Sequence, residues 1–111
     1  MSVIVKASPF FYLLSKQWTV QILYRLAENE THFNKLKDDL SGISAKVLTE
    51  RVRELEDWDF VSKEKVGNKV VYNLSHLGKE LHGNLDYLDV WLESWFTKAP
   101  EVTTEGMPVM T

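Results

Sequence analysis

Apolar residues recur at the spacing of a helix through the first forty residues of the chain. A short and very apolar stretch follows Pro9, a residue that suits the first turn of a helix. A second helix is predicted from Ser15 to Glu28, and its buried stripe is Trp18, Ile22, Leu23 and Leu26. Thr31 is a good N-cap for a third helix, whose buried face is Phe33, Leu36 and Leu40. This part of the chain is therefore expected to be helical throughout.

The pattern is most informative between residues 43 and 74. Ser41 and Gly42 signal a turn, and Ser44 is the expected N-cap of a helix over about 44–57. The apolar residues of that helix share one face: Leu48, Val52 and Leu55. Two strand-like segments follow at 60–66 and 69–74, joined by Gly67-Asn68, which suits a tight hairpin turn. Helix, turn, capped helix and hairpin are the order of a winged helix-turn-helix, with the hairpin at about 60–74 as the wing.

A last helix is predicted over about 76–96, capped by Ser75. Its apolar positions follow a near-heptad spacing: Leu77, Leu81, Leu85, Leu88, Leu92 and Trp95. That stripe, on a helix of about 30 Å, is more than one small domain needs. Residues 98–111 show no periodicity and are expected to form a flexible tail. The fold class is thus mainly α with a small β-hairpin, in a single domain over residues 1–97.

Composition narrows the class of protein. No run of eighteen apolar residues exists in the 111-residue chain, which argues against a membrane span. The chain has no cysteine, which fits a reducing cytoplasm and leaves no thiolate for metal or redox chemistry. The net charge of −3 argues against nucleic acid at first. However, residues 31–75 are balanced, and the acidity lies in the last third of the chain.

The outward face of the 44–57 helix is the best candidate for a DNA-reading surface. Arginine can hold a guanine edge with two hydrogen bonds, and lysine, serine and threonine can meet phosphates or bases. The expected DNA contacts are Ser44, Lys46, Thr49, Glu50 and Arg53, with Lys65 and Lys69 of the wing and Lys35 as backbone contacts. Two alternatives remain open: an ordinary solvated helix surface, which Glu50 and Asp57 favour, or a surface that binds another protein.

Other chemistry finds little support in the sequence. His32, His76 and His82 are too dispersed for a metal site, and we expect no cofactor. Asp86, Asp89 and Glu93 share a helix face that reads as solvated and acidic, because no nucleophile–base pair or phosphate-binding loop accompanies them. An enzyme is therefore not expected. Several aromatic residues, among them Trp18, Trp91 and Trp95, suit either packing or an aromatic ligand pocket.

With these elements placed, the chain resembles the HxlR-type winged-helix transcription regulators, which are related to the MarR group. The resemblance covers roughly residues 10–97, and a combination of segments in fixed order carries it: Lys16-Gln17-Trp18-Thr19, Ile22-Leu23-Tyr24-Arg25-Leu26, His32-Phe33-Asn34-Lys35-Leu36, the run from Ile43 to Glu56, Tyr72-Asn73-Leu74-Ser75 and Leu77-Gly78. It implies a homodimer joined through N- and C-terminal helices, bound to a pseudo-palindromic operator in duplex DNA. A small-molecule effector is left open. The interface residues expected from this are Phe10, Phe11, Leu81, Leu85, Leu88, Trp91, Leu92 and Trp95.

Three features depart from the family pattern. The cysteine that many members carry near the N-terminus is absent, so thiol sensing is ruled out for this chain. The wing is short and lacks a proline-containing insert, which puts extended minor-groove contacts in doubt. Asp59 stands where the family tends to have glycine, and aspartate tolerates a left-handed backbone better than most residues.

Overall fold

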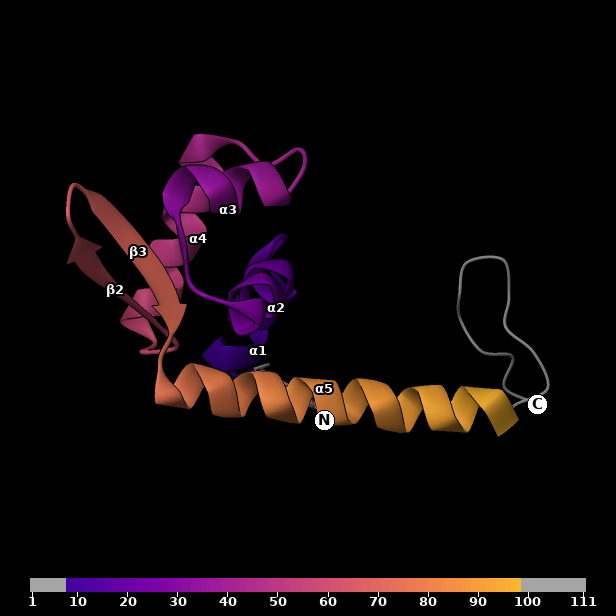
Figure 1. The fold of residues 1–111 in the computed structure, drawn as a ribbon. Helices are drawn as coiled ribbons and strands as arrows, with labels where there is room; N and C mark the ends of the chain where they lie inside the picture. Colours follow the sequence, from indigo (N-terminus) through magenta and orange to yellow (C-terminus); the bar gives the residue numbers. More distant parts are fainter. Residues whose placement is uncertain (1–7, 99–111) are drawn as a thin grey trace.

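The computed structural model describes residues 8–98, which form five helices and a small antiparallel sheet (Figure 1). The helices are α1 (Pro9–Ser15), α2 (Thr19–Glu28), α3 (Phe33–Asp39), α4 (Ala45–Asp57) and α5 (His76–Lys98). The strands are β1 (Thr31–His32), β2 (Val61–Val66) and β3 (Lys69–Leu74), in the sheet order β1-β3-β2. This confirms a mainly helical winged helix-turn-helix. No helix within the described range is long and apolar enough to cross a membrane.

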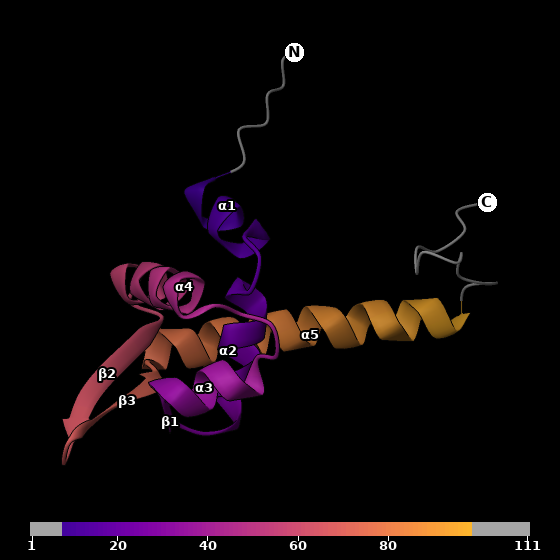
Figure 2. The same cartoon turned by 90° about the horizontal axis from the view of Figure 1, so that it is seen from above.

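The core lies where α2, α3 and α4 meet. Its most deeply buried side chains are Ile22, Leu23, Leu26, Leu36, Leu48 and Leu55. Val61 and Leu74, paired across the root of the β2–β3 hairpin, join the same core. Figures 1 and 2 show the hairpin projecting away from the helices, and α5 running under them and continuing well beyond. The far half of α5 therefore leaves its side chains uncovered in this chain.

The ends of α4 and α5 agree with the capping residues that the sequence predicts. The Ser44 hydroxyl accepts a hydrogen bond from the Val47 amide at 3.1 Å, and Ser75 accepts one from Gly78 at 2.9 Å. Asp59 takes the left-handed conformation, with φ of 65°. Gly67 also has a positive φ at the first central position of the two-residue hairpin turn.

Two predictions about the N-terminal half are wrong in detail. The helix expected from Ser15 to Glu28 begins only at Thr19, because Trp18 is in the left-handed conformation with φ of 81° and breaks the helix. Thr31 does not cap α3; it pairs with Tyr72 in the sheet, and His32 accepts the capping hydrogen bond from Lys35 at Nδ1. The hairpin is thereby extended to three strands. The tail expected over 98–111 lies outside the described residues, apart from Lys98, where α5 ends.

Candidate nucleic-acid interface

Helix α4 turns one charged face away from the core. Leu48, Val52 and Leu55 are buried, and this fixes the rotation of the helix, so Lys46, Thr49, Glu50 and Arg53 are exposed on the other side. Within residues 8–98, neither Lys46 nor Arg53 has an ion-pair partner. Both cations are therefore available to a partner from outside the chain.

Thr49 and Glu50 differ in what they offer on that face. The Thr49 hydroxyl donates a hydrogen bond to the Ala45 carbonyl at 2.8 Å, so its proton is engaged within the helix. Its oxygen can still accept a hydrogen bond, and its methyl group is free for an apolar contact. Glu50 is exposed and adds a negative charge beside the two cations. The face is thus mixed in charge, which suits selective contacts better than indiscriminate attraction to phosphates.

The wing carries three lysines that the sheet register places differently. Lys63 faces Tyr72 and Lys65 faces Val70, so both lysines lie on one face of the hairpin, and Lys69 lies on the other. Lys63 is held by Glu56 of α4, with Nζ and Oε2 3.6 Å apart. Lys65 is thus on the side of the wing that turns to α4. Lys69 borders a hollow of about 180 Å³ that His32 and Asn34 also line.

Lys35 is engaged with its neighbours on α3. Its ammonium lies 3.1 Å from Oδ1 of Asp39, whose other oxygen receives the Arg25 guanidinium of α2 at 2.7 Å. These hydrogen bonds, from Arg25 first and then from Lys35, lower the pKa of Asp39 below its usual value. The i,i+4 spacing to Lys35 signals one of the partners of Asp39, but Arg25, from another helix, carries no local signal.

Sequence reasoning also missed a set of contacts between α4 and the turn that precedes α2. Glu54 of α4 accepts the Lys16 ammonium at 2.6 Å on one oxygen and the Arg51 guanidinium at 3.3 Å on the other. Of these contacts, the Arg51–Glu54 pair has a local sequence signal, because the two residues lie at i,i+3 spacing on one helix. Arg51 also donates from Nε to the Gln17 carbonyl at 3.0 Å. These groups occupy the flank of α4 between its buried stripe and its outward face.

The apolar face of α5 is largely uncovered. Trp91 is 53% exposed, and Leu88, Leu92 and Trp95 are exposed with it. On α1, Phe11 is exposed, while Phe10 packs in part against Trp58 and Phe60. The prediction of Leu81 as an interface residue needs correction: it is buried in the core of its own chain, because the first turns of α5 pack on that core. Leu85 is half-buried against the same core.

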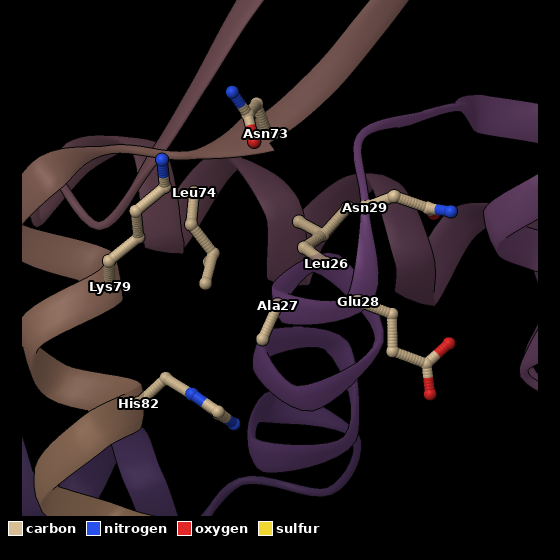
Figure 3. A pocket seen from close by; sticks show the side chains of 8 residues that line it. All are labelled: Leu26, Ala27, Glu28, Asn29, Asn73, Leu74, Lys79 and His82. Carbon is tan, nitrogen blue, oxygen red and sulfur yellow. The ribbon is translucent and has the colours of Figure 1, made fainter.

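Two hollows flank α5 where it passes α2. One, of about 260 Å³, is lined by Leu26, Ala27, Glu28, Asn29, Asn73, Leu74, Lys79 and His82 (Figure 3). In Figure 3, Lys79 and His82 project from α5, while the Glu28 carboxylate points away from α5.

The second hollow, of about 330 Å³, is bounded by Val20, Tyr24, Leu85, Leu88, Asp89 and Leu92. At Tyr24 the pKa is raised by burial and then by the charges of Asp86 and Asp89. No group of three metal-ligating side chains occurs within residues 8–98.

Comparison with known proteins identifies the family. The model of the family described as HxlR-like helix-turn-helix matches residues 13–100. The chain is 34% identical over 89 residues to the HTH-type transcriptional regulator MJ0925 of Methanocaldococcus jannaschii, with 77% of this chain and 80% of that one covered.

Solved structures of other regulators have a similar fold. The quinone-bound regulator YodB of Bacillus subtilis superposes with a TM-score of 0.68 at 28% identity, over 77% of this chain and 91% of YodB. A MarR-family regulator of Enterococcus faecalis has the same fold, with a TM-score of 0.75 at 24% identity over 88% and 96% of the two chains. The chain therefore belongs to the HxlR-like helix-turn-helix family of transcriptional regulators.

Proposed function

We propose that this regulator binds specific sequences of double-stranded DNA as a homodimer. The observation that carries the proposal is the outward face of α4, where Lys46 and Arg53 have no ion-pair partner within the described chain. An exposed helix with free cations, next to a projecting hairpin, has the shape and charge that a major groove and its bordering phosphates require.

The residues of this surface divide into two roles. Arg53 and Lys46 are proposed to read base edges, and Thr49 and Glu50 to add selectivity through the threonine methyl and the carboxylate, which can accept a hydrogen bond from cytosine N4. Ser44, at the N-terminus of α4, and Lys65 and Lys69 of the wing are proposed to contact phosphates and set the register. Lys35 joins them as a backbone contact by exchanging Asp39 for a phosphate, since an exposed ion pair is weak.

The homodimer is proposed from the uncovered face of α5. Leu88, Trp91, Leu92 and Trp95 are exposed on one long helix, with Phe11 on α1 as a further exposed aromatic. Large apolar side chains gathered along one helix mark an interaction surface. A second copy of the chain, with the same stripe, is the partner that fits a two-fold operator. The buried Leu81 would support that interface from within its own chain.

Any signal that this regulator receives must act without a cysteine thiol of the regulator itself, because the sequence contains no cysteine. The quinone bound to YodB belongs to YodB and sets no ligand for this chain. An effector, if one exists, would have to bind without forming a bond to sulfur. No enzymatic function is proposed.

The alternative function is a winged-helix module that binds another protein. Glu50 on the outward face and the net charge of −3 favour it over DNA. The free Arg53 and Lys46 favour DNA, because a protein partner would have to supply a carboxylate for each buried cation. The first function predicts binding of duplex DNA, and the alternative predicts none.

The proposal is tested by replacing Arg53 with alanine and measuring the affinity of the variant for the DNA upstream of the gene that encodes this protein. Loss of a bidentate base contact should weaken binding by about 1–3 kcal/mol and relax the preference at one base pair. Lys79→Ala, which removes a cation on α5 away from this face, is the matched control and should leave affinity unchanged. Equal affinity of the wild type and Arg53→Ala would refute the docking of α4.

A further inference from the structure

Three consecutive residues between α1 and α2 lie against the helix-turn-helix, two of them in contact with α4 and the third beside the turn that leads to α4. The Lys16 ammonium lies 2.6 Å from Oε2 of Glu54, and the Gln17 carbonyl accepts the Arg51 guanidinium at 3.0 Å. The tip of the Trp18 ring lies 3.9 Å from the point where a side chain at Gly42 would begin, in the turn that leads to α4. We call residues 16–18 the α1–α2 turn.

Lys16 joins two helices through one charged group. Its ammonium lies 5.2 Å from the centre of the Tyr12 ring on α1, a cation–π contact, and it ends on the Glu54 carboxylate of α4. Glu54 also binds Arg51, so the carboxylate is shared between two cations. The side chains of Lys16 and Glu54 are only 26% and 30% exposed, which reduces their screening by solvent.

The backbone of the α1–α2 turn has an unfavourable conformation at Trp18. Trp18 has φ of 81°, a left-handed value that is unfavourable for a bulky residue. Its ring is half-buried against the core. Such strain persists only where the surroundings fix the residue, so the contacts of Lys16, Gln17 and Trp18 act together to hold the turn.

The same contacts fix α4 from its flank. Successive residues of a helix are turned by about 100°, so Arg51 points about 200° away from Arg53 and toward the α1–α2 turn. Fixing Arg51 and Glu54 therefore restrains the rotation and sliding of α4 without occupying its outward face. Side chains that read base edges need placement within about 0.5 Å, and that precision depends on such supporting contacts.

We propose that Lys16 is a positioning residue for DNA binding, which holds α4 in its docking pose through Glu54. The inference rests on the proposed DNA-binding function and adds a residue that does not touch DNA.

A double-mutant cycle on DNA affinity tests the inference. Lys16→Met, Glu54→Gln and the double variant are titrated with the upstream duplex at several salt concentrations, at a temperature where circular dichroism shows each variant fully folded. Each single change should weaken specific binding by roughly 3- to 30-fold. The double variant should lose no more affinity than the single variant that binds the duplex less tightly. Lys16→Arg, which keeps the positive charge, should bind the duplex as the wild type does. The salt slope should stay that of the wild type, because no phosphate contact is lost.

Lys65→Met is the contrasting control, since loss of a phosphate contact should lower the salt slope by about one. A fall in slope for Lys16→Met, additive effects of the two changes, or unchanged affinity would each overturn the inference.

Amide hydrogen exchange of the DNA-free protein separates this inference from the proposed function. Lys16→Met should speed exchange in α4 and leave α3 as it is in the wild type. If exchange in α4 is unchanged, the positioning role is wrong whatever the DNA result. If α4 exchanges faster and the wild type binds no duplex, the proposed function fails while the tie between Lys16 and α4 stands.

Discussion

The close approach of α5 to the start of β2 makes Gly78 a sharp test of the packing. A Cβ atom at Gly78 would lie 1.9 Å from the Phe60 carbonyl oxygen and 2.9 Å from its carbonyl carbon. Both are backbone atoms, so relief requires a shift of about 1 Å or more in either α5 or the root of the wing. That carbonyl also accepts a hydrogen bond from the Ser75 amide at 3.0 Å, which such a shift would break.

The magnitude for Gly78→Ala follows from three contributions. Overpacking costs about 1–3 kcal/mol, and loss of the Ser75 hydrogen bond costs about 1 kcal/mol. Alanine regains about 1 kcal/mol of helix propensity over glycine. The net loss in the free energy of unfolding is therefore about 1–3 kcal/mol, and each kcal/mol lowers Tm by roughly 4–8 °C for a domain of this size.

Gly83→Ala provides the matched control on the same helix. Nothing lies within 4 Å of a Cβ built at Gly83, so only the gain in helix propensity remains, and Tm should rise. Thermal unfolding of the wild type and both variants should be followed by circular dichroism at one protein concentration, because association shifts Tm. A Gly78→Ala protein as stable as Gly83→Ala would refute the packing of α5 on the wing root.

Two further predictions concern the dimer and the acid side of the stability curve. Trp91→Glu places a charge on the uncovered face of α5 and should shift sedimentation from dimer to monomer, whereas Glu93→Gln should not; a Trp91→Glu dimer of wild-type affinity would exclude this interface. The pKa of Asp39 is lowered in the folded chain, so its contribution is present above the unfolded pKa and is lost as pH falls through the folded pKa. Asp39→Asn should thus be less stable than the wild type in urea at pH 7, and the difference should shrink as pH falls below the unfolded pKa of aspartate; a difference that stays constant from neutral to acid pH would disprove the linkage.

The parts of the fold that the sequence predicted are those with local signals. Ser44 and Ser75 cap α4 and α5 where expected, because a serine just before an apolar periodic run can accept a hydrogen bond from a free amide in the first turn of the helix. Gly67 and Asp59 adopt the positive φ values that their residue types tolerate. The outward face of α4 follows from its apolar stripe, and Lys46 and Arg53 on that face have no ion-pair partner among residues 8–98.

What the sequence could not predict depends on contacts between distant residues. Trp18 interrupts the predicted helix, although its side chain fits the helical period, because periodicity does not report the sign of φ. Thr31 has a good capping side chain, but pairing with Tyr72 across 41 positions overrides it. The Lys16–Glu54 pair spans 38 positions and has no local pattern, and it is the contact on which the inference about α4 depends.

Specific binding of duplex DNA by this chain through α4 can be measured by fluorescence anisotropy. The labelled ligands are the duplex upstream of the gene and a scrambled duplex of the same length and composition, each titrated at several salt concentrations. We expect tighter binding to the upstream duplex than to the scrambled duplex, with affinity that falls steeply as salt rises. Absence of binding to either duplex at low salt would contradict this expectation and favour a protein partner for the outward face of α4.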